Sequence, residues 1–157
     1  MKLTRDLREF IELLNAHGVE YLLVGGWAFG FHATPRYTGD LDFFLRCDGE
    51  NGARLKRVLS DFGFTELEGF EDSFLQEDRM LQFGVPPNRI DILTQISGVS
   101  FSEAWASRLN GELEGLQVPF ISRECLIRNK VAAGRLKDLA DVEALQKTAP
   151  QKDESSR

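Results

Sequence analysis

The sequence predicts an α/β (α+β) domain in which a mixed sheet is flanked by helices. Segments with helical periodicity alternate with short apolar segments along the 157 residues, which is the pattern of helices packed on a sheet. Residues 79–85 and 89–96 have the character of two strands joined by Pro86-Pro87-Asn88. Because such a hairpin pairs its strands antiparallel, the sheet cannot be purely parallel.

The first part of the chain is expected to form helices over residues 4–17, 27–33 and 52–62 and strands over residues 20–24 and 40–46. The first helix has apolar residues three and four apart, with a threonine at the N-cap position and a glycine directly after it. The strand over 20–24 is a short apolar run that ends at two glycines.

The strand over 40–46 alternates, with Leu41, Phe43 and Leu45 on one face and Asp40, Asp42 and Phe44 on the other. We therefore expect truncation of Phe43 to cost more stability than truncation of Phe44.

The second part of the chain is expected to form the hairpin, a short helix over residues 101–108, a strand over 115–121 and helical segments over 122–146 that are interrupted near Gly134. Residues 66–76 show no clean periodicity. We expect one domain over residues 1–148 and a disordered tail over 149–157.

Composition excludes several classes of protein. The chain is 42% apolar and 28% charged and has no apolar run near the roughly 20 residues that span a membrane. Its N-terminal residues carry dispersed charges, unlike a secretory signal, so we expect a cytoplasmic protein. Cys47 and Cys125 are far apart and only two histidines occur, so free thiols are expected rather than a zinc site or a disulfide framework.

The net charge of -6 has the wrong sign for nonspecific binding of a polyanion, although nucleic acid could still bind locally. No P-loop and no GxGxxG dinucleotide motif is present. Gly25 and Gly26 lie between a predicted strand and a predicted helix, where backbone N–H groups can face a phosphate. The alternative is that one of these glycines is needed for a positive φ or for close packing.

Acidic residues interrupt two of the predicted strands. Asp40 and Asp42 share one face of their strand, and carboxylates that converge in this way can bind hard cations. The same spacing occurs at Asp48/Glu50, Glu66/Glu68, Glu112/Glu114 and Asp141/Glu143, but there it falls in polar segments. Asp91 interrupts the strand over 89–96. If these two strands are neighbours, three carboxylates converge.

The segment VGGWAFGFHATPRYTGDLDFFL, followed some fifty residues later by RIDIL, resembles the signature of the polymerase-beta-type nucleotidyltransferase superfamily. Arg36, Thr38 and the helical segment LIRNKVAAGRLKDLADVEAL resemble the small bacterial subgroup near the abortive-infection and toxin-antitoxin nucleotidyltransferases. The resemblance implies transfer of a nucleoside monophosphate from an NTP, with Mg2+ or Mn2+, to an acceptor that is RNA, protein or a small molecule.

The resemblance also implies roles for individual residues. The implied catalytic and metal-binding residues are Asp40, Asp42 and Asp91, and the implied nucleotide-binding residues are Gly25, Gly26, Arg36 and Lys130. For Lys130 the alternative is a solvated helix residue, with Lys137 and Asp141 forming an ordinary surface pair. The roles of Lys137, Asp138 and Asp141 stay open.

The sequence departs from the family pattern at Gly26, where many active members have serine, and it lacks the additional acceptor-binding domain of larger members. These departures motivate an alternative, in which the chain is an interaction protein, such as a toxin-antitoxin component, with a weak or unused site. His32 either packs in the core or approaches a ligand, and Trp27 and Phe29 are expected in the core.

Overall fold

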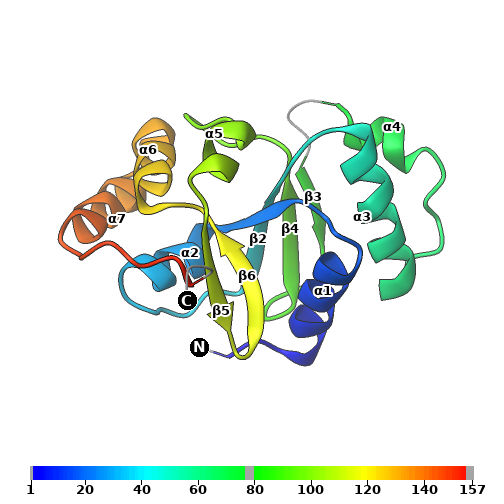
Figure 1. Ribbon diagram of the computed structural model, residues 1–157, viewed down its shortest axis with the longest axis horizontal. Coiled ribbons are helices and arrows are strands. Elements are labelled where there is room, and N and C mark those ends of the chain that lie inside the picture. Colours follow the sequence, from blue (N-terminus) through cyan, green and yellow to red (C-terminus); the bar gives the residue numbers. More distant parts are fainter. Residues whose placement is uncertain (1, 77–79, 155–157) are drawn as a thin grey trace.

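The structure is a computed structural model that describes residues 2–76 and 80–154. These residues form a six-stranded sheet of order β3-β4-β2-β1-β6-β5, with helices on both sides (Figure 1). The elements in chain order are α1 Arg5–Ala16, β1 Tyr21–Val24, α2 Gly25–His32, β2 Asp40–Leu45, α3 Gly49–Phe62, α4 Phe70–Phe74, β3 Met80–Phe83, β4 Arg89–Leu93, α5 Phe101–Ala106, β5 Leu109–Leu113, β6 Leu116–Phe120, α6 Arg123–Ala133 and α7 Leu136–Gln146.

The sheet is mixed, as predicted. Strand β1 pairs antiparallel with β2 and parallel with β6, while β2 pairs parallel with β4. The β3–β4 and β5–β6 pairs are antiparallel. The predicted hairpin across Pro86 and Pro87 is thus confirmed, although the predicted first residue of its first strand, Arg79, lies outside the described residues.

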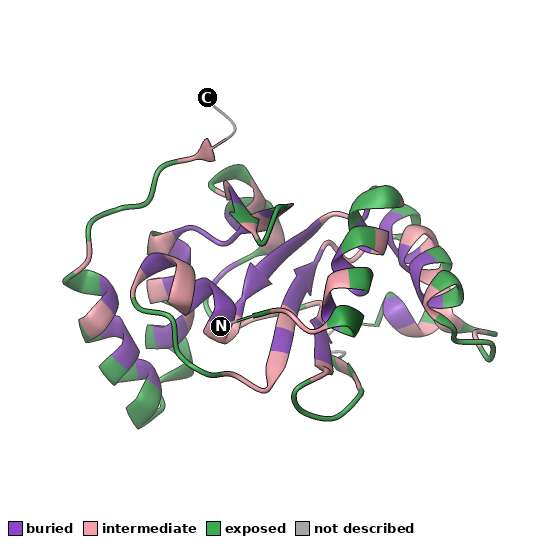
Figure 2. Ribbon diagram, turned by 90° about the horizontal axis from the view of Figure 1, so that it is seen from below, coloured by how far each residue is buried: buried purple, intermediate pink, exposed green. Residues whose placement is uncertain are grey.

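Two groups of helices enclose the sheet. Helices α1, α3 and α4 lie to one side of it and α2, α6 and α7 to the other (Figure 1). Strands β1, β2 and β4 are largely buried, whereas the outer faces of the helices are exposed (Figure 2). Phe10 of α1 packs against Phe43 of β2 with ring centroids 5.4 Å apart, which anchors the first helix to the centre of the sheet.

The predicted alternation of side chains along β2 is correct, but Phe44 is as buried as Phe43, which removes the reason to expect a smaller cost of truncation at Phe44. Phe43 is 0% exposed and Phe44 is 1% exposed. Phe44 lies against Phe101 of α5, with ring centroids 5.2 Å apart. Because helices cover both faces of the sheet, the face that carries the aspartates also contributes an aromatic residue to the core.

Some elements differ from the sequence expectation. Helix α2 begins at Gly25 rather than at Trp27, and α3 begins at Gly49 because the Asp48 side chain accepts a hydrogen bond from the backbone N–H of Asn51. Helix α4 lies in a segment without periodicity, and β5 was not predicted. Helix α5 ends at Ala106, which leaves residues 109–113 free to pair with β6.

The other expectations concern the thiols, the membrane and the tail. Cys47 is half-buried and Cys125 is buried, and neither of these two cysteines forms a disulfide, as predicted. Among the described helices, none has the length and apolar character needed to cross a membrane. After α7, the Asp153 carboxylate accepts a hydrogen bond from the backbone N–H of Asn110 at 3.3 Å, while residues 155–157 of the predicted tail lie outside the described part.

Candidate active site

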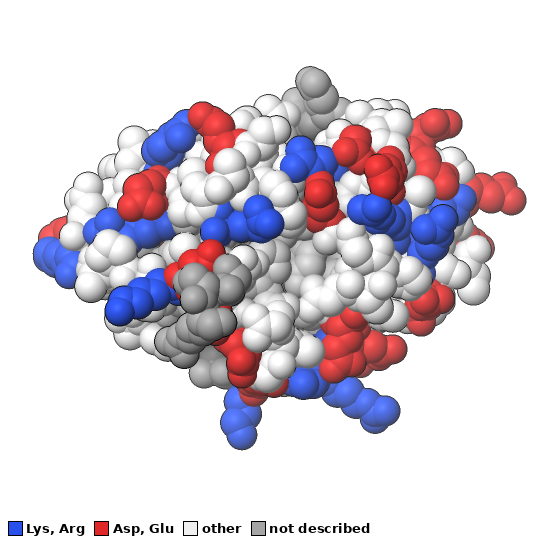
Figure 3. Space-filling view, in the orientation of Figure 1, with Lys and Arg blue, Asp and Glu red and all other residues white. Residues whose placement is uncertain are grey.

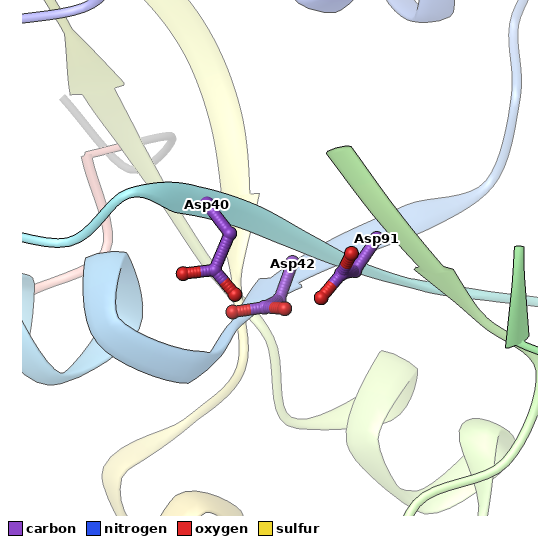
Figure 4. A group of neighbouring side chains, drawn as sticks. All are labelled: Asp40, Asp42 and Asp91. Atoms are coloured by element: carbon purple, nitrogen blue, oxygen red, sulfur yellow. The ribbon is translucent and has the colours of Figure 1, made fainter. Parts of the chain in front are cut away.

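Three aspartates converge on one face of the sheet, as the two strand patterns predicted. The parallel pairing of β2 with β4 places Asp42 beside Asp91 and Asp40 beside Arg89. Each of the three aspartates offers a carboxylate oxygen within 4.8 Å of those of the other two, and Figure 4 shows their side chains directed toward one another. We call Asp40, Asp42 and Asp91 the carboxylate triad.

Mutual repulsion and burial change the protonation of the triad. Burial, reinforced by the nearby Asp40 and Asp91 carboxylates, raises the pKa of Asp42 to about 8. A hydrogen bond between Asp42 and Asp91 acts in the same direction because the neutral Asp42 can donate to its neighbour. At neutral pH, without a metal ion, the Asp42 carboxyl is therefore mostly protonated.

Two side chains orient the triad. The Thr38 hydroxyl donates to Oδ1 of Asp40 at 2.9 Å. The Arg89 guanidinium donates through Nε to Oδ1 of Asp91 at 3.0 Å and through Nη2 to Oδ2 at 3.1 Å. Sequence reasoning missed Arg89, although its place two residues before Asp91 puts both side chains on one face of β4.

The diglycine has a packing role at both positions. Gly25 has φ +62°, and a Cβ atom there would lie 2.1 Å from Oδ2 of Asp42. A Cβ atom on Gly26 would lie 3.1 Å from Cβ of Thr38. The close-packing interpretation is therefore confirmed. It is compatible with phosphate binding, because no side chain caps α2 and its first N–H groups have no partner within the helix.

Two hollows meet at the triad. The first lobe, of 480 Å³, lies between residues 95–97 and α6, and the second lobe, of 670 Å³, lies between residues 36–40, the β3–β4 edge and α7. The residues shared by both lobes are Gly25, Asp42, Leu93, Lys130, Arg135 and Asp138. Gly26, Asp40 and Asp91 line the second lobe only. Asp42 thus lies where the two lobes meet, and Asp40 and Asp91 face the second lobe beside it.

Two of the predicted nucleotide-binding cations are ion-paired. Arg36 donates from Nη1 and Nη2 to the two carboxylate oxygens of Asp141 at 2.7 and 2.9 Å. Nζ of Lys130 donates to Oδ2 of Asp141 at 2.8 Å and lies 3.7 Å from Oδ1 of Asp138. Asp141 therefore does not form the surface pair with Lys137 that was one of the sequence alternatives, and Lys130 is not a solvated helix residue.

The ion pairs with Arg36 and Lys130 change the pKa of Asp141. Burial would raise the pKa of this carboxyl, but the hydrogen bonds from Arg36 and Lys130 outweigh it and hold the pKa at about 2. Hydrogen bonds from Arg135 likewise lower the pKa of Asp138. Both acids are thus ionised at neutral pH, in contrast to Asp42.

The remaining candidates belong to the core. Nε2 of His32 donates to the backbone oxygen of Ile121 at 2.7 Å, and burial lowers the pKa of the imidazole. This supports the packed interpretation of His32. Trp27 and Phe29 are buried, as predicted.

Comparison with solved structures identifies the fold. No protein-family model and no curated protein matches the chain. The lincosamide antibiotic adenylyltransferase LnuA, with lincomycin bound, is 16% identical with a TM-score of 0.59, over 94% of this chain and 99% of LnuA. A Thermotoga maritima protein assigned to the nucleotidyltransferases is 15% identical with a TM-score of 0.58, over 90% of this chain and 94% of that protein.

A third structure is ANT(2″)-Ia in complex with adenylyl-2″-tobramycin. It is 16% identical with a TM-score of 0.56, over 88% of this chain and 84% of that protein. The similarity covers the sheet and its flanking helices at identities that establish the fold alone. The chain thus has the fold of the polymerase-beta-type nucleotidyltransferases.

Proposed function

We propose that the protein is a metal-dependent nucleotidyltransferase that transfers a nucleoside monophosphate from an NTP to an acceptor and releases pyrophosphate. The observation that carries the proposal is the carboxylate triad, with oxygens within 4.8 Å of one another, at the junction of two lobes. A transferase of this kind must bind a nucleotide and an acceptor together, and the two lobes supply two such spaces.

The triad fits a divalent cation. Its donors are carboxylate oxygens, which Mg2+ and Mn2+ prefer, and burial together with the neighbouring carboxylates raises the pKa of Asp42, an effect that a bound cation would oppose. Asp40, Asp42 and Asp91 would hold the ion. When bound, it would supply positive charge to the reacting phosphate and to the attacking and leaving oxygens.

The chain's own residues would bind the substrates and move one proton. The open N–H groups at the start of α2, at Gly25 and Gly26, and the ammonium of Lys130 are suited to bind the triphosphate. Asp91, which lines the second lobe, would accept the proton of the acceptor's hydroxyl. Arg89 holds this carboxylate in a fixed orientation through two hydrogen bonds.

The acceptor is drawn from three classes: RNA, protein and small molecules. Two of the structural neighbours are named for antibiotic substrates or contain an antibiotic, so lincosamides and aminoglycosides belong among the small molecules tested. A toxin-antitoxin partner protein belongs among the proteins.

The test combines binding with transfer. The protein is titrated with each of the four NTPs with and without Mg2+ or Mn2+, and α-labelled NTPs are then incubated with RNA, protein and antibiotic acceptors. We expect metal-dependent NTP binding and label transfer, and Asp42→Asn should lose both. Absence of metal-dependent NTP binding would refute the proposal, and binding without transfer to any acceptor would favour the alternative of an interaction protein with an unused site.

A further inference from the structure

A partly buried charge cluster connects three separate segments beside the lobes. It consists of Arg36 before β2, Lys130 and Arg135 around the end of α6, and Asp138 and Asp141 on α7. Asp138 is 1% exposed, Asp141 is 6% exposed and Lys130 is 8% exposed. Burying charges in this way contributes little net stability because desolvation opposes the attraction. The cluster therefore calls for a functional explanation.

Lys130 is, with Arg135 and Asp138, one of three cluster members that line the junction of the lobes. It lines both lobes, together with Gly25 and Asp42. Its ammonium has three N–H donors. One N–H group donates to Oδ2 of Asp141 at 2.8 Å, and a second points toward Oδ1 of Asp138, which lies 3.7 Å from Nζ. The remaining donor is available to a ligand at the junction.

Arg36 lines the second lobe, and its guanidinium is held by the same carboxylate. Both of its Nη groups donate to Asp141, and its guanidinium lies 4.0 Å from the ring centroid of Phe29. Oδ2 of Asp141 accepts from Arg36 at 2.9 Å and from Lys130 at 2.8 Å. Any movement of Arg36 would therefore be transmitted to Lys130 through one oxygen atom.

We propose that Asp141 and Arg36 are positioning residues that fix the ammonium of Lys130 at the junction of the two lobes, where it binds the triphosphate. The inference rests on the proposed function. It assigns Arg36 a positioning role in place of the direct nucleotide contact that the resemblance implied. A lysine side chain loses rotamer freedom when it binds a ligand. Because Asp141 already holds Lys130 in the folded protein, that loss occurs before the nucleotide arrives.

The test is a double-mutant cycle on nucleotide binding. The ligand is the Mg2+ complex of the best-bound NTP, in its non-transferable form with a methylene between the α and β phosphorus atoms. The variants are Lys130→Met, Asp141→Asn, Arg36→Gln and the two double variants that contain Lys130→Met. We expect each of the three single variants, Lys130→Met, Asp141→Asn and Arg36→Gln, to raise the Kd for this nucleotide by about tenfold.

The double variants decide between direct and indirect action. If Asp141 and Arg36 act only through Lys130, adding either substitution to Lys130→Met should leave Kd unchanged. An additive increase for Arg36→Gln would show that Arg36 contacts the nucleotide itself and would overturn the inference. An Asp141→Asn variant that binds as tightly as the parent would overturn it as well.

The matched control is Glu143→Gln, also on α7, where an exposed carboxylate pairs only with Lys147 at 2.9 Å. This variant should bind as the parent does. Folding of each variant is checked by its melting temperature. If Asp141→Asn does not fold, Arg36→Gln carries the test, because the Arg36 side chain is 46% exposed. A parent that binds no nucleotide would refute the proposed function, whereas a binding parent with an additive cycle would refute only this inference.

Discussion

The proton held by the carboxylate triad should make the metal-free protein less stable as the pH rises. The pKa of Asp42 is raised to about 8, from an ordinary value of 3.8. Between these values the folded state binds one proton more than the unfolded state. The free energy of unfolding should therefore fall by about 1.4 kcal/mol per pH unit, or about 2.7 kcal/mol between pH 5 and pH 7.

Urea unfolding of the parent and of Asp42→Asn at pH 5, 6 and 7, in the presence of a chelator, measures this effect. Because the asparagine side chain of the variant cannot titrate, the variant should gain stability relative to the parent by about 2 to 3 kcal/mol over this range. Asp72→Asn, which removes an exposed carboxylate from α4, is the control and should run parallel to the parent. Parallel curves for Asp42→Asn as well would mean that the triad does not hold the proton.

A divalent cation must displace the same proton. Below pH 8 the apparent affinity of the parent for Mn2+ should therefore rise by about tenfold per pH unit. Calorimetric titrations in two buffers of different ionisation enthalpy should report about one proton released per ion bound. A hundredfold excess over Kd should stabilise the parent by about 2.7 kcal/mol, and Asp42→Asn should lose most of this increment. An unchanged metal response in Asp42→Asn would make this residue a structural acid.

Three further predictions address the packing and the charge cluster. Gly25→Ala should lower both stability and metal affinity because its Cβ would collide with a triad carboxylate. Gly18→Ala, at a similar φ of +69° but with open space around the Cβ, should lower stability alone. Urea unfolding measures the stability of each variant, and Mn2+ titration measures its metal affinity. Phe43→Ala and Phe44→Ala should each cost about 3 to 5 kcal/mol in urea unfolding, and a much smaller cost for Phe44 would contradict its burial. The depressed pKa of Asp141 stabilises the folded state above about pH 4, and this contribution is lost as the pH falls toward 2, so Asp141→Asn should flatten that part of the acid-denaturation curve.

The sequence was informative where local patterns act alone. Periodicity predicted α1, β1, β2 and the β3–β4 hairpin, because apolar spacing and turn residues are local properties. Strand β5 was missed because its sequence, LNGEL, has no β-branched or aromatic residue, and its pairing with β6 is what makes it a strand. The burial of Phe44 was missed because it depends on α5, which packs on β2 from a distant part of the chain.

In the candidate site, too, the features set by local patterns could be predicted and those set by tertiary packing could not. The triad could be predicted because each aspartate interrupts an apolar strand, and only the pairing of β2 with β4 had to be assumed. The charge cluster could not be predicted, since Arg36 and Asp141 are 105 positions apart and no spacing relates them. The sequence could indicate that charges gather on α6 and α7, but the partners of those charges depend on tertiary structure.

The net charge of -6 and the arrangement of charges at the site favour a nucleotide that binds together with a metal ion. Acidic and basic side chains are interspersed over the face shown in Figure 3. Among the described residues that line the lobes, every arginine and Lys130 is ion-paired with an aspartate, which leaves Lys137 as the one cation without an ion pair. A bare triphosphate would therefore approach three carboxylates with little free positive charge to offset the repulsion. Under the proposed function, a divalent cation bound to the triad would neutralise most of this negative charge, so the metal would supply the positive charge that offsets the repulsion, while Lys130 and the start of α2 would determine where the phosphates lie.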